Sequence, residues 1–427
     1  MKLLLLQNNY TNYFVMNYKK FLLLTFLFFS CSETHDKNSL SNEQFIKAQK
    51  IISFLEQSQM NLSKGNYQSS INFVDSALYI DKNLVYPIFI KGMIYEDLNQ
   101  YDIADSLYHK VLEKVPNFRS ANFNLGNIAL ARGEYSKAVK HFKKEEEIYS
   151  SSDVLIKLGV AYANIYEIDS ALVVLEKSIS IDSLASEAFM LMGKIYRDNG
   201  DVQKAKMFMR KGLDINPDNW DYQLNFGTLL FKMGNLNESL FYLNNVVNVN
   251  KWHYASHYNL GQLLLRMGKN EDADKYLLRA DTLQQVNTRI GFYQQNLTSN
   301  PDNISDWLNM GIALQSIENY TEAYEVFKIV DHLDPNNLDV KQNLAFLAIS
   351  NEDTVSSIKY YQNILSNDNS KSDIWFNLGL IYAYQGKFNS AEKCWKKTIE
   401  INPNDKTAIK YLESLSKVQE LPFYLTN

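Results

Sequence analysis

The chain has 427 residues, of which 46% are hydrophobic and 13% are aromatic, and its formal net charge is −5. The apolar side chains are numerous enough for a continuous core. The acidic balance and the lack of a basic stripe exclude nucleic acid as the expected partner, because its phosphates require such a stripe. Cysteine occurs only at Cys31 and Cys394, so no framework of disulfides is expected.

The first organised stretch is a short apolar run that follows two lysines. Lys19 and Lys20 precede residues 21–29, in which only Thr25 is polar. A transmembrane helix needs about 20 apolar residues, whereas a secretory signal has an apolar core of about 7–15 residues after a basic segment. Residues 1–31 are therefore predicted to form a signal peptide, with Met16 as an alternative start.

The apolar run ends in Leu27-Phe28-Phe29-Ser30-Cys31, with a small residue directly before the cysteine. This order resembles the bacterial lipoprotein box. The resemblance implies a lipid on Cys31 and anchoring at the cell envelope, on the outer membrane, with the periplasmic or surface face left open. The alternative is an unmodified cysteine in a signal that is discarded. The polar residues 32–42 predict a flexible tether.

Residues 375–403 show the unit from which the rest of the chain is built. Trp375, Leu378 and Tyr382 are spaced three and four apart, which is one face of a helix. A break around Gly386 is followed by a second amphipathic run, and Pro403 ends it because proline cannot supply the next helical N–H. The pattern predicts a helical hairpin.

This hairpin recurs along the chain at a fixed period. Trp307 and Trp375 lie 68 residues apart, two steps of 34. Glycine stands at the eighth place of most units: Gly92, Gly126, Gly159, Gly193, Gly227, Gly261, Gly311 and Gly379. A small residue recurs in the second helix: Ala104, Ala138, Ala171, Ala205, Ser239, Ala273, Ala323 and Ala391. Glycine in a helix interior costs about 0.5–1 kcal/mol relative to alanine, so its repeated use predicts a place where two backbones cross closely.

The pattern W-x2-L-G-x2-Y, then A-x3-F, then P, resembles the tetratricopeptide repeat, whose period is 34 residues. The resemblance implies an all-α fold, an α-solenoid of about ten helical hairpins. The ten units are predicted to begin at Ile51, Val85, Arg119, Ser152, Ser186, Trp220, Tyr254, Ile304, Leu338 and Ser372. Units one and nine depart from the pattern, with Ser58 and Ala345 at the glycine place.

The period fails once, at residues 286–303. Val286, Ile290, Tyr293 and Leu297 are spaced four, three and four, which predicts a helix without a partner, either separate from residues 271–285 or continuous with them. We predict a joint here between an array of repeats 1–7 (residues 43–285) and an array of repeats 8–10 with a capping helix (residues 304–418). Residues 419–427 are expected to be a loose tail.

In the tetratricopeptide family the first helix of each unit lines a concave groove that binds peptides. The resemblance therefore implies candidate groove residues at the fifth and sixth places of the units: Phe89, Phe123, Tyr258 and Phe376, with Asn124, Asn225, Asn259, Asn309, Asn343 and Asn377. An asparagine amide offers both a donor and an acceptor. The asparagine row either holds the backbone of an extended peptide or bonds only within its own array.

The sequence contains no HExxH motif, no G-x-S-x-G motif and no glycine-rich phosphate loop. His253 and His257, four apart, either chelate zinc or only begin a helix and line the groove, and no third ligand is evident. Neither an enzyme, a metal nor a cofactor is therefore expected.

The leading expectation is a lipid-anchored adaptor or scaffold that binds protein or peptide partners, similar to bacterial outer-membrane tetratricopeptide lipoproteins. The alternatives are a structural subunit of a secretion, pilus or motility complex, and a helper of envelope hydrolases. The oligomeric state stays open, because repeats do not encode the identity of a partner.

Overall fold

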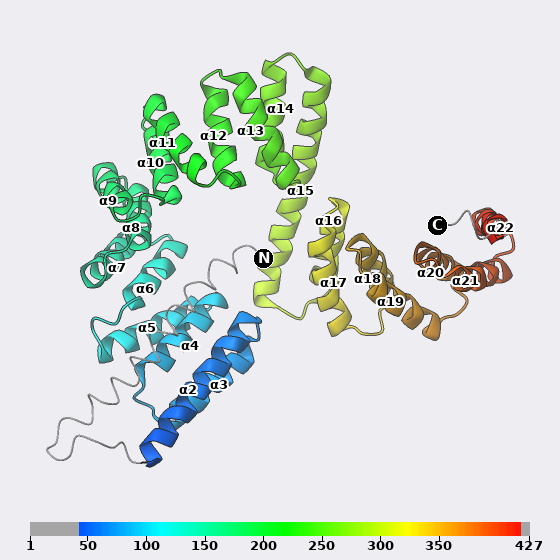
Figure 1. The fold of residues 1–427 in the computed structure, drawn as a ribbon, viewed down its shortest axis with the longest axis horizontal. Helices are drawn as coiled ribbons and strands as arrows, with labels where there is room; N and C mark the ends of the chain where they lie inside the picture. Colours follow the sequence, from blue (N-terminus) through cyan, green and yellow to red (C-terminus); the bar gives the residue numbers. More distant parts are fainter. Residues whose placement is uncertain (1–41, 420–427) are drawn as a thin grey trace. The chain divides into compact units, whose positions relative to one another are not determined.

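The computed structural model describes residues 42–419, and all the regular structure in that range is α-helical (Figure 1). The predicted signal peptide with Cys31, nearly all of the tether, and residues 420–427 lie outside the described residues. The chain divides into two compact units, with the boundary between Tyr222 and Gln223 inside one helix.

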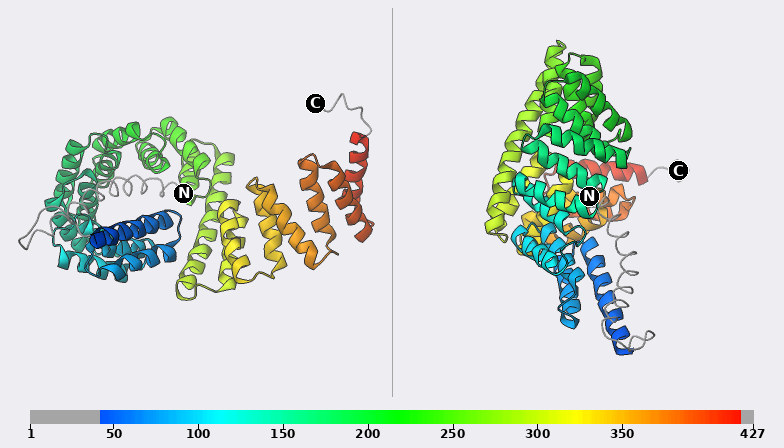
Figure 2. Two further views of the ribbon diagram at one scale, coloured as in Figure 1. Left: turned by 60° about the horizontal axis from the view of Figure 1, so that its bottom comes forward. Right: turned by 90° about the vertical axis from the view of Figure 1, so that its left-hand side faces the viewer.

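The described residues form ten antiparallel hairpins and one further helix (Figures 1 and 2). The first helices of the hairpins are α2 (Asn42–Ser63), α4 (Val85–Asp97), α6 (Ala121–Ala131), α8 (Ser152–Asn164), α10 (Ser186–Asp198), α12 (Trp220–Lys232), α14 (Tyr254–Arg266), α16 (Ile304–Ser316), α18 (Leu338–Ser350) and α20 (Ser372–Tyr384). The second helices are α3 (Tyr67–Ile80), α5 (Tyr101–Lys114), α7 (Tyr135–Ile148), α9 (Ile168–Ile181), α11 (Val202–Ile215), α13 (Leu236–Val249), α15 (Asn270–Ser299), α17 (Tyr320–Leu333), α19 (Thr354–Asn367) and α21 (Phe388–Ile401). The final helix is α22 (Lys406–Gln419).

This architecture confirms the predicted all-α solenoid of ten hairpins with a capping helix. Eight first helices begin at the residue where the repeat pattern places the start of a unit; α6 begins at Ala121, two residues after Arg119, and α2 begins at Asn42, well before Ile51. Within each unit, each hairpin also packs against the next one along the chain, as α3 does on α4 and α17 does on α18. The core is therefore continuous along a unit.

The repeated glycines are explained by the side chain that lies over each of them. A Cβ added at Gly379 would lie 2.4 Å from Nε1 of Trp395, and one at Gly126 would lie 2.5 Å from the Phe142 ring. The sequence predicted that two backbones cross closely at each glycine. The atoms nearest to the glycine instead belong in most repeats to a large side chain of the second helix, which stands four residues after the small residue of that helix. Each such ring or aliphatic chain fills the space that a Cβ would occupy.

Helix α15 has 30 residues, about twice the length of the other second helices, because the predicted extra segment continues it without a break. Its first half pairs with α14 and its second half packs on α16. Leu283 and Val286 contact the buried Ala313 and Ile317, and further along, Leu297 joins the core of α16–α18. Helix α15 is thus the second helix of repeat 7, and its second half also packs against the first helix of repeat 8. The division of the array at residues 286–303 stays a prediction.

The last helix, α22, covers the end of unit 2. The Tyr411 ring lies 5.6 Å from Phe376 and 5.3 Å from Trp395, and Leu415 packs against the same group. These contacts bury the face of repeat 10 that would otherwise lie open to solvent. Among the helices of residues 42–419, none has the length and apolar character that crossing a membrane requires.

Replacing Gly379 with alanine is expected to destabilise repeat 10. The added Cβ would lie 2.4 Å from Trp395 Nε1, and the ring is held by Tyr411 and the backbone carbonyl of Phe376. Overpacking of this kind costs about 1–3 kcal/mol. Hydrogen exchange of the amides between residues 372 and 415 should be faster in Gly379→Ala than in the unchanged chain.

Gly291, in the second half of α15, provides the matched control. It is helical, and a Cβ added there meets nothing within 4 Å. Gly291→Ala should therefore stabilise the helix by about 0.5–1 kcal/mol through helix propensity alone. Equal destabilisation by the two substitutions would show that the large side chains do not impose the glycine positions.

Candidate functional site

The candidate site is the face of each unit that is made by the first helices of successive repeats, here called the first-helix face. Positions 5, 9 and 12 of a repeat are four and three residues apart, so their side chains share one side of a first helix. Position 1 is the predicted start of each unit. The candidate residues from the sequence occupy positions 5 and 6.

The four aromatic candidates at position 5 differ in how much of the ring reaches solvent. Phe89 is only 4% exposed, and its ring lies 5.5 Å from Tyr108 and 5.0 Å from Phe118. Phe123 and Phe376 are half-buried, whereas Tyr258 is 50% exposed. Position 5 thus belongs mainly to the core in repeat 2 and opens to solvent in repeat 7.

The asparagines at position 6 make hydrogen bonds that join neighbouring repeats. Asn124 donates to the hydroxyl of Tyr108 at 2.9 Å, and Asn259 donates to Oγ1 of Thr228 at 3.1 Å. Asn377 hydrogen-bonds to the hydroxyl of Tyr361. In each case the partner belongs to the preceding repeat, so part of the hydrogen-bonding capacity of these amides serves the array itself.

The other three asparagines complete the row. Asn309 is exposed, and its only described contact is a long 3.5 Å hydrogen bond to Ser305 in its own helix. Asn225 and Asn343 are half-buried, and Asn225 has an interaction partner. Of the six, Asn309 is the amide that presents most of its polar surface to solvent.

A half-buried carboxyl group that the sequence did not single out extends this network. Glu96, at position 12 of repeat 2, accepts a 2.6 Å hydrogen bond from the Tyr108 hydroxyl, which in turn accepts from Asn124. Burial raises the pKa of Glu96 to about 7, and the neighbouring Asp97 adds to the shift, while the Tyr108 hydrogen bond opposes it. A Glu-Tyr-Asn chain thus links repeats 2 and 3.

In unit 1 the first-helix face carries ion pairs around repeats 4 and 5. Lys157 pairs with Glu187 at 3.5 Å and Lys194 pairs with Asp221 at 3.4 Å, each pair bridging two successive repeats. Arg197 lies 2.8 Å from Asp198. These groups are largely exposed, so each pair contributes little to stability but fixes where charge lies on the face.

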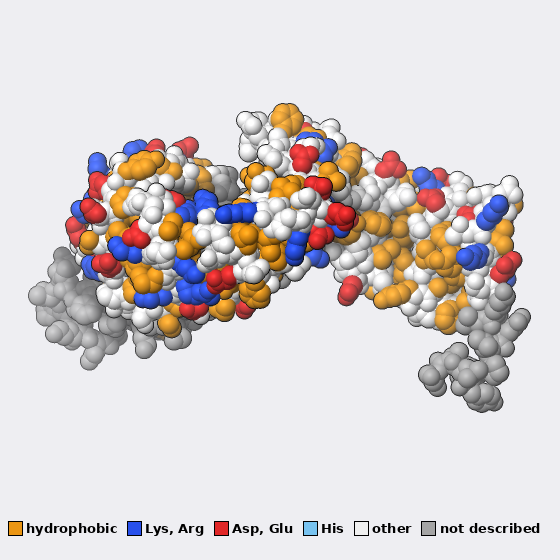
Figure 3. Space-filling model, turned by 90° about the horizontal axis from the view of Figure 1, so that it is seen from above, with side chains coloured by type: hydrophobic (Ala, Val, Ile, Leu, Met, Phe, Trp, Pro, Cys, Tyr) orange, Lys and Arg blue, Asp and Glu red, His pale blue; other side chains and the backbone are white. Residues whose placement is uncertain are grey.

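In repeats 8 and 9, within unit 2, the exposed side chains at positions 9 and 12 are apolar. Ile312 and Phe346, both at position 9, are 49% and 43% exposed, and Ile349, at position 12, is 39% exposed. Figure 3 shows hydrophobic side chains gathered over the C-terminal repeats. The sequence could have identified these residues, because positions 9 and 12 lie on the same side of a first helix as position 5. The prediction considered only positions 5 and 6.

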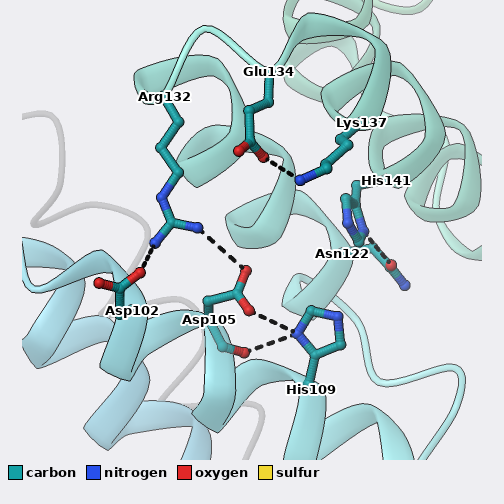
Figure 4. A network of polar contacts seen from close by, with 8 residues as sticks. All are labelled: Asp102, Asp105, His109, Asn122, Arg132, Glu134, Lys137 and His141. Carbon is teal, nitrogen blue, oxygen red and sulfur yellow. Dashed lines mark hydrogen bonds and ion pairs between the residues drawn. The ribbon is translucent and has the colours of Figure 1, made fainter.

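A second polar network lies on the side of the α5 and α7 helices (Figure 4). Arg132 lies 2.6 Å from Asp102 and 4.0 Å from Asp105, and Asp105 contacts His109 at 3.2 Å. The His141 ring meets the His109 ring edge-on at 6.2 Å, and burial lowers the pKa of His141. This network ties repeat 2 to repeat 3.

His253 and His257 each have a hydrogen-bond partner, and Cys394 is buried. His257 Nε2 lies 3.0 Å from the carbonyl of Lys251, and His253 Nδ1 lies 2.6 Å from Ser256 Oγ. Burial raises the pKa of the Cys394 thiol to about 11, which makes it a poor nucleophile. In the part of the chain that the structure describes, no group of three His, Cys, Asp or Glu residues is placed to hold a metal ion.

Family models described as tetratricopeptide repeat match four segments: residues 91–153, 186–219, 254–287 and 372–405. The chain contains tetratricopeptide repeats. The segments at 186–219 and 372–405 each contain one complete hairpin, α10–α11 and α20–α21. Repeats of this type support protein or peptide partners for the chain. The lipoprotein resemblance of the first 31 residues is separate from these matches.

A TPR repeat-containing protein of Methanocaldococcus jannaschii is 28% identical over 107 residues, which make up 25% of this chain. The chain spans only 19% of the length of that curated relative. The similarity therefore concerns a few repeats and not a whole protein.

Three solved structures share the repeat at low similarity. MamA from Desulfovibrio magneticus RS-1 is 19% identical, with a TM-score of 0.37, over 40% of this chain and 97% of that one. YrrB, a TPR protein with an unusual peptide-binding site, is 19% identical, with a TM-score of 0.36, over 46% and 97%. The P58(IPK) TPR domain is 15% identical, with a TM-score of 0.23, over 86% and 98%. With all three TM-scores below 0.5, no function is transferred to this chain from them.

The half-buried Glu96 makes the stability of unit 1 depend on pH. Its pKa in the folded chain is about 7, above its ordinary value of 4.5, so the folded state holds the proton more tightly than the unfolded state. The free energy of unfolding should therefore fall as the pH rises from about 4.5 to about 7. In Glu96→Gln, whose amide carbonyl can still accept from Tyr108, this part of the pH dependence should disappear from the thermal midpoints.

Glu113→Gln, at an exposed position of α5, controls for the loss of a negative charge and should leave the profile unchanged. Identical pH profiles for the unchanged chain and Glu96→Gln would contradict the assignment of the protonation to Glu96.

Proposed function

We propose that this protein is a scaffold that binds partner proteins or peptides on its first-helix faces and is held at the cell envelope by a lipid on Cys31. The binding role rests on the exposed apolar side chains at positions 9 and 12 of repeats 8 and 9. Ile312, Phe346 and Ile349 are all 39% or more exposed.

Single exposed apolar residues are common on protein surfaces, but these occur at equivalent positions of successive repeats. Full burial of such a side chain contributes about 1.5–3 kcal/mol relative to exposure. A partner that covers several of them at once would gain that free energy, and the exposed Asn309 amide beside them can pair with a peptide group. The combination suits an extended segment with apolar side chains.

Unit 1 offers a different surface to a partner. Its first-helix face carries the ion pairs Lys157–Glu187 and Lys194–Asp221, and charges of both signs are already paired within the array. A partner there would have to replace these pairs with charges of its own. We therefore assign the apolar contacts to unit 2 and a charge-dependent selectivity to unit 1.

The envelope location rests on the sequence alone. The basic segment at Lys19 and Lys20, the apolar run and the pair Ser30-Cys31 stand in the order of a lipoprotein signal, and the tether 32–42 would separate the lipid from the first repeat. Acylation of the cysteine would anchor the repeats without a membrane-spanning helix.

Selection of a displayed library of extended peptides on the purified chain tests the binding role. Phe346→Lys, on the first-helix face of α18, should weaken the selected peptides at least tenfold, because it places a charge among the apolar contacts. Phe241→Lys, on the second helix α13, is the matched control; Phe241 is 61% exposed and should tolerate the change. Equal affinities for both variants would locate binding elsewhere.

Replacement of Cys31 tests the anchor. Cells that express the unchanged chain and are fed a fatty-acid analogue should label the protein, and Cys31→Ala should abolish the label and release the protein from the membrane fraction or leave its signal uncleaved. Ser32→Ala, at the adjacent residue, should leave the label in place. If the wild-type chain carried no label, the lipid anchor would be wrong, and the signal would indicate secretion without an anchor.

A further inference from the structure

We propose that one end of unit 1, formed by the start of α2 and the adjoining edge of repeats 1 and 2, contacts the surface of a lipid bilayer. This inference rests on the proposed function, because a lipid on Cys31 would bring a bilayer to this end of the chain. Three observations carry it: the early start of α2, the apolar and basic side chains beside it, and the carboxylates at the opposite edge of the unit.

Helix α2 begins earlier in its repeat than the other described first helices do (Figure 1). Asn42 stands nine residues before Ile51, the predicted start of the unit, since 51 minus 42 is nine. A helix rises about 1.5 Å per residue, so α2 extends about 13 Å beyond the usual starting level of a first helix. The side chains of residues 43–47 are all exposed. The added turns are therefore a surface feature and not a part of the core.

The early start of α2 lies at one edge of the unit. Because α2 and α3 are antiparallel, α2 begins at the end of the hairpin where α3 ends. The loops at residues 81–84 and 115–120 follow at the same edge, here called the inter-repeat edge. Lys114 donates to Oδ1 of Asn83 at 3.4 Å, so the edge is continuous across repeats 1 and 2.

Large apolar side chains are exposed along this part of the inter-repeat edge. Phe45 and Ile46 in the first turns of α2 are 47% and 61% exposed, and Tyr79 near the end of α3 is 87% exposed. Val115, directly after α5, is 40% exposed. Side chains of this kind enter the headgroup region of a bilayer, where a tyrosine ring is buried while its hydroxyl stays hydrated.

Basic side chains accompany the apolar ones. The exposed basic residues at the inter-repeat edge of repeats 1 and 2 are Lys47, Lys50, Lys82, Lys114 and Arg119, and the carboxylates there are Glu43, Asp81 and Glu113. Lysine and arginine place their charge among lipid phosphates while their aliphatic stems cover apolar surface. Beyond repeat 2 the same edge carries Glu146, Glu147, Asp153 and Asp182, so the basic stretch ends there.

The opposite edge of unit 1, where first helices end and second helices begin, has the opposite balance of charge. Its carboxylates include Asp97, Asp102, Glu134, Glu167, Asp169, Asp198 and Asp201, and its basic residues include Lys64, Arg132, Lys137, Arg197 and Lys204. Of these basic residues, all but Lys64 are ion-paired with carboxylates of that edge. A bilayer with anionic headgroups would therefore attract the start of α2 and repel the opposite edge.

The distance to the proposed anchor favours a bilayer over other occupants of this surface. Cys31 and Asn42 are eleven residues apart, since 42 minus 31 is eleven. A chain spans at most about 3.6 Å per residue, so a lipid on Cys31 would hold the start of α2 within about 40 Å of the bilayer, whatever path the chain takes. Tethering over such a distance gives a local concentration on the order of millimolar, at which weak contacts suffice.

Quenching of a fluorescent dye by lipid tests the contact. The acylated full chain is returned from detergent to vesicles of phosphatidylethanolamine and phosphatidylglycerol whose acyl chains carry a quencher. One variant carries the dye on Tyr79→Cys and the other on Tyr166→Cys. Tyr166 lies between α8 and α9 at the opposite edge and is 88% exposed, which makes it the matched control. Cys394 is buried, and the lipid occupies the Cys31 thiol.

The dye at position 79 should be quenched about threefold more strongly than the dye at position 166, because only the inter-repeat edge enters the headgroup region. Equal quenching at the two positions would overturn the proposal. A dye at position 79 that is shielded from water in detergent as fully as in vesicles would also overturn it, and would make the occupant a second copy of the chain.

Reversal of charge in α2 provides a second measurement. Lys47→Glu combined with Lys50→Glu should lower the quenching at position 79 about threefold, because the phosphates then repel the start of α2. Lys64→Glu combined with Lys137→Glu is the control at the opposite edge. In each pair one lysine is ion-paired with a nearby glutamate, at 2.9 Å for Lys47 and 2.8 Å for Lys137. Equal effects of the two pairs would contradict a contact through α2.

The lipid on Cys31 is measured separately, by labelling with the fatty-acid analogue. If the chain is labelled but the quenching is equal at positions 79 and 166, only this inference is wrong and the proposed anchor stands. If the chain carries no lipid, the anchor and this inference are both wrong. Binding of peptides by repeats 8 and 9 is independent of both results.

Discussion

The structure depends on one contact that recurs in every typical repeat, a large side chain of the second helix seated over the glycine of the first helix. Phe142 over Gly126 and Trp395 over Gly379 show the arrangement at opposite ends of the array. The missing Cβ lets the two helices approach, and the small residue one turn earlier in the second helix keeps the rest of the interface close. This contact and the packing of each hairpin on its neighbours both stabilise the array, and because they recur in each repeat the fold can be extended.

Because packing uses positions 8, 20 and 24 of a repeat, the outward positions of the first helices are free to vary. Repeat 5 carries charged groups there, such as Lys194, and repeats 8 and 9 carry exposed apolar groups such as Ile312. Two surfaces of different chemistry therefore arise on one scaffold without a change in its core. The outward positions set the chemistry of the surface, while the recurring glycines and the large side chains over them maintain the scaffold.

Helix α15 shows how the array accommodates an irregular period. Its second half offers Val286 and Leu297 to the repeat that follows, in the way that an ordinary second helix would. The indole N–H of Trp252 and the guanidinium of Arg279 both donate to the carbonyl of Ile317, which fixes the end of α16 against repeat 7. A missing first helix is thus compensated by lengthening a second helix, and the hydrophobic core continues past the irregularity.

The sequence by itself determined the helical hairpins, their number and most of their starting residues. These features depend on spacing within about 34 residues, and the spacing of apolar and small residues along the chain encodes them directly. The sequence also indicated that residues 286–303 are helical, because their apolar positions follow a helical period. It did not distinguish whether they continue the preceding helix.

Only the tertiary structure decided what each side chain of the first-helix face does. Phe89 and Tyr258 occupy the same position of their repeats, yet Phe89 packs against Phe118 and Tyr258 is half exposed. Asn124 and Asn309 likewise share a position, but one is bonded to Tyr108 and the other faces solvent. Burial and hydrogen bonding at these places depend on side chains supplied by the neighbouring repeats. The period of a single repeat encodes its helices, but it does not encode those contacts between repeats.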